Sequence, residues 1–278
     1  MQSTWPQQPL PEQPFQGPEP QQPEQPRRRR GLGGVAVAAA AVAAKFKAVL
    51  LLLPKLKLLT TSGTMLLSVA AYTLFFGLPF AVGFVLLILV HEMGHVIQLR
   101  REGVKASAPI FIPFLGAVVG MKEMPKNALA EARVGLAGPV LGTLGAAVPA
   151  AIGLATGSHF WLALAFTGFL INLFNLAPVL PLDGGRAMAA MAPWMWFAGF
   201  AGMIALTIVW PNPIMILILL LGGMETWRRW KARKAGSGGN ERYYEVPPRA
   251  RLAVAAVYLG LIAVLVVGMA ETFVQRSL

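Results

Sequence analysis

The feature that most constrains the fold is a run of residues, 58–90, that contains no charged side chain. As a single helix rising about 1.5 Å per residue it would be about 50 Å long, whereas the hydrocarbon core of a bilayer is about 30 Å thick. The run must therefore fold back on itself. The sequence FGLPF, with Gly77 and Pro79, is the expected turn. We predict helices near 60–77 and 80–99.

The composition agrees with a membrane protein. Of the 278 residues, 56% are hydrophobic and only 13% are charged, which fits neither a disordered chain nor an average soluble domain. Further apolar stretches lie at about 134–182, 187–209, 213–227 and 252–270, and the first is long enough for two helices joined at ATGSHF. We predict an all-α polytopic membrane protein with about six or seven transmembrane helices.

The same patterns divide the chain into segments. The N-terminal residues are rich in Pro and Gln and too poor in apolar side chains to fold. Lysines interrupt the apolar residues that follow, which favours an interface over the bilayer centre. The expected segments are a disordered tail at 1–31, a basic interfacial helix at 32–59, an intramembrane core at 60–230, a cytoplasmic linker at 231–249 and a C-terminal transmembrane helix at 250–278.

The basic residues indicate how the chain lies in the membrane. The formal net charge is +12, but the Lys and Arg residues cluster beside apolar stretches. This pattern is typical of cytoplasmic loops and of contact with anionic lipid, and we do not expect a nucleic-acid partner. We predict a multi-pass protein of the cell membrane with a cytoplasmic N-terminal tail.

Three ionisable residues follow directly on the apolar run, in the sequence HEMGH. Residues four apart lie on one face of a helix, so His91 and His95 can bind the same ion, and Glu92 can reach a water on it. The alternative is that the histidines are merely hydrogen-bonded core residues. Three ionisable groups at membrane depth need neutralisation, which a divalent cation supplies, and this favours a metal site.

A catalytic zinc site needs a third protein ligand and an open position for water. The chain has no Cys, so the ligand must offer nitrogen or oxygen. His159 falls at a turn between two helices, where we expect a surface residue. Asp183, the sole Asp in the sequence, follows a proline-broken helix and precedes Gly184 and Gly185, which allow close backbone approach. We favour Asp183 as a ligand over the alternative of a helix N-cap.

The segment 106–121 differs from the other apolar stretches. Its prolines and glycines, with β-branched and aromatic residues between them, indicate a hairpin or loop and not a helix. Irregular backbone at membrane depth is tolerated where protein or a wet cavity borders it, so we predict a re-entrant β-loop after the HEMGH helix. A buried loop outside the membrane is the alternative.

Two motifs together resemble the site-2 protease family of intramembrane zinc metalloproteases. They are HEMGH and NLAPVLPLDGG, which begins at Asn175. The resemblance implies one zinc ion bound by His91, His95 and Asp183, with Glu92 as the general base. It also implies that Asn175 positions the substrate or stabilises the oxyanion.

The chain departs from many bacterial members in two ways. It has no room for a PDZ domain between the catalytic helices. It also has Gly142 where many carry an Asn after the Gly-Pro of the third helix.

The expected function is hydrolysis of a peptide bond in or near the transmembrane helix of a membrane protein, as in regulated intramembrane proteolysis. The resemblance also implies the plasma membrane of a bacterium. Two alternatives stay open: a zinc-binding membrane scaffold that does not cleave, and a divalent-metal transporter. Transport usually uses a repeated architecture, and the sequence has no internal repeat.

Overall fold

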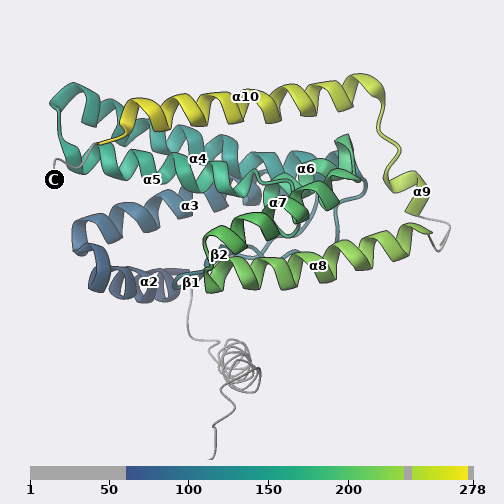
Figure 1. The fold of residues 1–278 in the computed structure, drawn as a ribbon, viewed down its shortest axis with the longest axis horizontal. Helices are drawn as coiled ribbons and strands as arrows, with labels where there is room; N and C mark the ends of the chain where they lie inside the picture. The colour runs from purple at the N-terminus through teal and green to yellow at the C-terminus, as the bar shows by residue number, and fades with distance from the viewer. Residues whose placement is uncertain (1–60, 235–239, 275–278) are drawn as a thin grey trace, which may run out of the picture. The chain divides into compact units, whose positions relative to one another are not determined.

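The computed structural model describes residues 61–234 and 240–274, which belong to one compact unit. The predicted tail at 1–31 and interfacial helix at 32–59 lie outside the described residues. The described part is mostly helical with one small sheet, as the sequence predicts. α4 lies at the centre, where it packs against α3, α5, α6 and α10 (Figure 1).

The long uncharged run folds back where the sequence predicts. α2 (Thr61–Phe76) and α3 (Leu78–Arg101) are separated by Gly77, whose φ of 78° is readily adopted by glycine. Pro79 lies in the first turn of α3, where its missing N–H costs no helical hydrogen bond. α3 ends at two arginines, which suit the negative end of its helix dipole.

A short hairpin follows α3. β1 (Ile110–Ile112) pairs antiparallel with β2 (Gly116–Val118), which confirms the hairpin predicted within 106–121. Side chains of α2 hold it: the backbone N–H of Phe111 donates to the Thr64 hydroxyl at 3.2 Å, and that of Phe114 to the Tyr72 hydroxyl at 3.0 Å. α2 therefore supports the hairpin through hydrogen bonds as well as apolar contact.

The next long uncharged stretch also forms two helices. α4 (Ala128–Thr156) begins after Asn127, whose side chain accepts a hydrogen bond from the N–H of Ala130 and caps the helix. It ends at Gly157, which is left-handed, and α5 (His159–Asn175) follows. The turn lies within ATGSHF, as predicted.

The C-terminal part contains more breaks than the sequence analysis predicts. Its helices are α6 (Asp183–Met191), α7 (Met195–Val209), α8 (Pro213–Lys234), α9 (Asn240–Tyr243) and α10 (Pro248–Thr272). The stretch 187–209, predicted to be continuous, is split at Pro193. Proline disfavours helical backbone in the residue before it, and Ala192 is extended at φ −157° and ψ 86°. The break between α7 and α8 falls at the predicted Pro-Asn-Pro.

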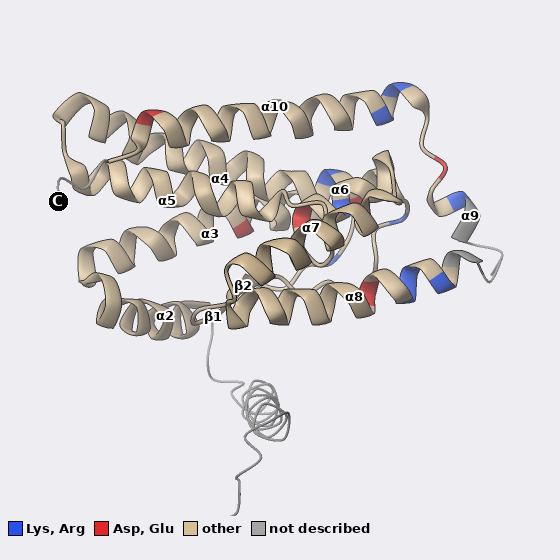
Figure 2. Ribbon diagram, viewed as in Figure 1, with Lys and Arg blue, Asp and Glu red and all other residues tan. Residues whose placement is uncertain are grey.

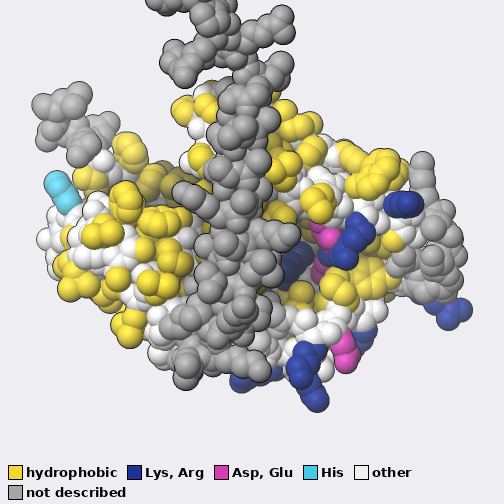
Figure 3. All heavy atoms as spheres, turned by 90° about the horizontal axis from the view of Figure 1, so that it is seen from below, with side chains coloured by type: hydrophobic (Ala, Val, Ile, Leu, Met, Phe, Trp, Pro, Cys, Tyr) yellow, Lys and Arg dark blue, Asp and Glu magenta, His cyan; other side chains and the backbone are white. Residues whose placement is uncertain are grey.

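Three described helices are long and apolar enough to cross a membrane: α3, α4 and α10. The apolar helices α2, α5 and α7 are shorter. Charged residues gather where α8 ends and α10 begins (Figure 2), and much of the described surface visible in Figure 3 is hydrophobic. This distribution fits a bundle with one charged end and a lipid-facing wall.

A buried ion pair joins α8 to the start of α4. Arg229 lies 2.8 Å from Glu131, whose side chain is 3% exposed, and the Tyr243 hydroxyl donates to the same carboxylate at 2.7 Å. Burial and then the negative charge of Glu131 raise the pKa of Tyr243 far above its usual range, so the hydroxyl stays protonated and keeps donating. The guanidinium also lies over the Trp196 ring.

This network makes a prediction about stability. Replacing Arg229 by Ala leaves a buried carboxylate without its cation, and we expect the unfolding free energy to fall by about 3–5 kcal/mol. The neighbouring Arg228 is exposed and pairs only with Glu225, so Arg228→Ala should cost at most about 1 kcal/mol. Unfolding of the two purified variants in detergent tests the difference, and equal effects would contradict it.

Candidate metal centre

The HEMGH residues lie in the third quarter of α3, one helical turn apart. His91, Glu92 and His95 are all buried, and one ligand atom from each lies within 4.8 Å of the others. The two imidazoles approach directly, with 3.2 Å between their Nε2 atoms. The i, i+4 spacing therefore brings both rings to one point, as the sequence predicts.

Asp183 reaches the same point from α6. Its Oδ2 lies 3.1 Å from Nε2 of His91 and 3.2 Å from Nε2 of His95. Leu182 occupies the N-cap position, and Asp183 is the first residue of the helix. The carboxylate is thus directed at the imidazoles and does not cap its own helix, in keeping with the interpretation favoured from the sequence.

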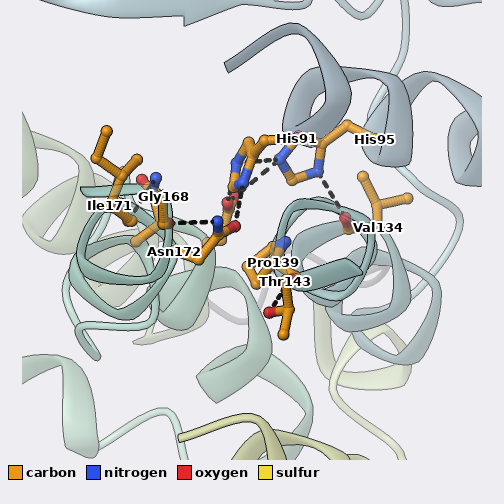
Figure 4. A network of polar contacts seen from close by, with 10 residues as sticks. His91, His95, Val134, Pro139, Thr143, Gly168, Ile171 and Asn172 are labelled. Atoms are coloured by element: carbon orange, nitrogen blue, oxygen red, sulfur yellow. Dashed lines mark hydrogen bonds and ion pairs between the residues drawn. The ribbon is translucent and has the colours of Figure 1, made fainter. Parts of the chain in front are cut away.

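The other ring nitrogens fix the tautomer of each histidine. Nδ1 of His91 lies 2.8 Å from Oδ1 of Asn172, and Nδ1 of His95 lies 2.8 Å from the carbonyl oxygen of Val134 (Figure 4). The Asn172 amide is oriented because its Nδ2 donates to the Gly168 carbonyl at 2.8 Å. Both Nδ1 atoms therefore donate a proton, which leaves both Nε2 atoms with free lone pairs.

Three electron-rich atoms consequently face one another: two Nε2 atoms and one carboxylate oxygen. Such a group is electrostatically favourable around a cation. In a tetrahedral zinc site with bonds of about 2.0–2.1 Å, ligand atoms lie about 3.3–3.4 Å apart. The observed separations of 3.1–3.2 Å come close to this spacing. The residues present thus fit one metal ion held by two imidazoles and a carboxylate, with Glu92 beside it.

Glycines on α4 make the close approach possible. A Cβ on Gly138 would overlap the Nε2 atoms of both histidines, and one on Gly142 would overlap the side-chain amide of Asn172. These two small residues, four apart on α4, form the wall of the cluster. Gly142, where many relatives of the resembled family carry Asn, thus leaves room for Asn172 from α5.

The first turn of α6 is held equally tightly. A Cβ on Gly184 would overlap the backbone of Leu176, and one on Gly185 the backbone of Val179, which confirms the expected close approach. The indole N–H of the fully buried Trp196 donates to the Gly185 carbonyl at 2.7 Å. These contacts position the carboxylate of Asp183 from outside the cluster.

The sequence analysis did not identify Asn172, which contacts His91. Asn175, which it did name, makes a hydrogen bond within its own helix and not with the described metal cluster. Asn175 is half-buried, and its amide donates to the Ile171 carbonyl at 3.1 Å. Asn172 lies nearly one turn earlier on the same helix, and it contacts His91. An amide in an otherwise apolar helix was the available signal. His159 is exposed at the start of α5, the surface position expected for it.

The fold and the cluster define a helical membrane protein with a buried site arranged to hold one metal ion. Residues 79–158 match the model of Peptidase family M50. The matched region contains HEMGH, and it confirms the resemblance to site-2 proteases.

Two relatives support the same assignment. A zinc metalloprotease of Methanocaldococcus jannaschii is 33% identical over 135 residues, which is 45% of this chain and 37% of that protein. Rip3 of Mycobacterium tuberculosis, provisionally named a zinc metalloprotease, is 32% identical over 119 residues, 39% of this chain and 29% of that protein. The chain thus matches 37% of one relative and 29% of the other, well under two thirds of the length of either.

The hydrogen bond to His91 makes a prediction about metal affinity. We expect Asn172→Ala to weaken zinc binding by about 10–100-fold, because His91 loses the acceptor that fixes its tautomer. Asn175→Ala is the matched control and should leave affinity unchanged, because its amide bonds within its own helix. Competition with a chromophoric chelator measures both, and unchanged affinity in Asn172→Ala would contradict the role assigned to Asn172.

The glycine wall makes a second prediction. A methyl group at position 138 would occupy the space between the two Nε2 atoms, so Gly138→Ala should abolish stoichiometric zinc binding. Gly260→Ala on α10 introduces the same group into open space and should bind zinc normally. Metal content after dialysis distinguishes them, and a zinc-loaded Gly138→Ala variant would disprove the steric argument.

Proposed function

We propose that this chain is an intramembrane zinc metalloendopeptidase that hydrolyses a peptide bond in or near the transmembrane segment of a membrane protein. The observation that carries the proposal is the convergence of two imidazole Nε2 atoms and the Asp183 carboxylate at 3.1–3.2 Å, with the carboxylate of Glu92 adjacent. The M50 match and the names of the relatives support the same activity.

In this proposal His91, His95 and Asp183 hold one zinc ion. Bound there, zinc lowers the pKa of a water to about 7 and polarises the substrate carbonyl. Glu92 takes the proton from the attacking water and returns it to the leaving amine. Burial of the cluster keeps these charges in a low-dielectric surrounding, where they act more strongly than in water.

Asn175 is proposed to position the substrate or to stabilise the developing oxyanion. Its amide is half-buried and engaged only by the Ile171 carbonyl in the described structure. That local hydrogen bond is exchangeable, because the amide has a second N–H and a free carbonyl oxygen. Asn172 instead supports His91 through its carbonyl oxygen and donates to the Gly168 carbonyl.

The substrate is proposed to be presented as a strand. A helix hides its carbonyl groups in its own hydrogen bonds and must unwind before hydrolysis. The β1–β2 hairpin offers sheet edges to an unwound segment, and its exposed apolar side chains, Ile110, Phe114 and Val118, suit a segment from the membrane. We infer that the hairpin is the re-entrant loop predicted from the sequence.

The proposed topology is multi-pass, with six or seven helices in the cell membrane. Beside α3, α4 and α10, the shorter helices α2, α5 and α7 are apolar, and α8 adds an apolar first half. The charged end of the bundle is proposed to be cytoplasmic, because Lys and Arg dominate it. The N-terminal tail is placed on the same side.

Substitution of Glu92 tests the function. We expect Glu92→Gln to bind zinc but to lower cleavage of a reconstituted transmembrane substrate by at least about 100-fold, because the general base is lost. Activity and metal content are measured on the same preparation, with Glu123→Gln, an exposed residue outside the cluster, as the control.

Other outcomes separate the alternatives. If the wild-type protein and Glu92→Gln both bind zinc but neither cleaves any transmembrane substrate, the scaffold is favoured. Zinc flux into vesicles that survives Glu92→Gln would favour a transporter. Either result would contradict the peptidase proposal.

A further inference from the structure

A groove lies between α3, α4 and α10, the three described helices that are long enough to cross a membrane. Its volume of about 510 Å³ falls within the range of about 300–1,000 Å³ that small-molecule sites occupy. A helix, at about 10–12 Å across, is much larger than such a space. The groove therefore fits a slender molecule and not another transmembrane segment.

The lining changes in character along the groove. Arg101 from the end of α3 and Arg133 from the second turn of α4 lie at one end. Val140 and Leu141 of α4 and Val257 of α10 line the other. From Arg133 to Leu141 the groove follows α4 for about 12 Å. One end is thus cationic and the remainder apolar.

The cationic end of the groove has one carboxylate for two arginines. Arg101 is exposed, and Arg133, with a side chain 55% exposed, lies 3.5 Å from Glu102 in a long ion pair. The Glu102 side chain is 8% exposed and also accepts a hydrogen bond from Gln98, so it neutralises at most one of the two arginines. Two guanidinium groups and one carboxylate leave a net positive charge where α3 ends and α4 begins.

The groove does not open onto the metal centre. Gly94 lies against Ala137 so closely that a Cβ on it would overlap the Ala137 carbonyl oxygen. The imidazoles of His91 and His95 point to the other side of this contact, toward Gly138. A molecule in the groove is therefore separated from the cluster by backbone, which excludes the peptidase substrate as its occupant.

We propose that this groove is a binding site for an anionic phospholipid. The phosphate group lies between Arg101 and Arg133, and one acyl chain follows the apolar wall toward Val257. Basic pockets between transmembrane helices bind anionic headgroups in this way. A zwitterionic lipid matches the apolar wall equally well but offers the arginines no net charge. The site does not depend on the peptidase activity.

Lipid binding to the full-length protein tests the proposal. The protein in nonionic detergent is titrated with phosphatidylglycerol or with phosphatidylcholine of identical acyl chains, and retained lipid is counted by native mass spectrometry. We expect phosphatidylglycerol to bind at least about tenfold more tightly, because two arginines contact its charge. The midpoint temperature of thermal unfolding should rise with phosphatidylglycerol and not with phosphatidylcholine.

Substitutions locate the site. The double variant Arg101→Gln/Arg133→Gln should lose the preference for phosphatidylglycerol, whereas Arg228→Gln, at an exposed arginine outside the groove, should keep it. Ala253→Trp fills the groove from α10 and should lower binding of both lipids. Ala256→Trp, exposed on α10 but outside the groove, should not.

Two results would overturn the proposal. One is that the wild-type protein binds both lipids equally and that neither the double arginine variant nor Ala253→Trp changes this binding. The other is an equal thermal shift with free glycerol phosphate, which would indicate a phosphate site without a role for the acyl chain. Unfolding of each variant without lipid shows that a loss of binding does not reflect a loss of fold.

Discussion

The orientation of the two imidazole rings determines the rest of the site. Because both Nδ1 atoms donate outward, to Asn172 on α5 and to the Val134 carbonyl on α4, both Nε2 atoms must face the carboxylate of Asp183. This requires four helices to meet at one point inside an apolar bundle. This requirement explains two features of the sequence. Glycines in α4 and α6 allow the close approach, and prolines break the chain just before α6.

Much of the helical framework could be predicted because its causes are local. An uncharged run too long for one bilayer crossing must turn, and Gly77 and Gly157 mark where it turns. The break at Pro193 was missed because the residues on both sides are equally apolar, so hydropathy continues across it. A proline acts on the backbone of its neighbours, which a count of apolar residues does not register.

The candidate site was predictable to a similar extent. The ligand residues belong to two compact motifs, so His91, His95 and Asp183 could be named before the structure brought them together. The groups that orient them were not found. A backbone carbonyl, such as that of Val134, has no signature in the sequence. Asn172 resembles its neighbour Asn175, and only the packing of α5 against Gly142 distinguishes them.

The contact between Gly94 and Ala137 has a mechanical consequence. Side chains that separate two helices can change rotamer and let the helices slide, but touching backbones have no such freedom. α3 and α4 therefore act as one stiff body, clamped beside the residues that hold the metal. Bending and opening are left to the helices that side chains join, such as α2 with its aromatic contacts to the hairpin. We therefore expect less relative motion between α3 and α4 than between α2 and the hairpin.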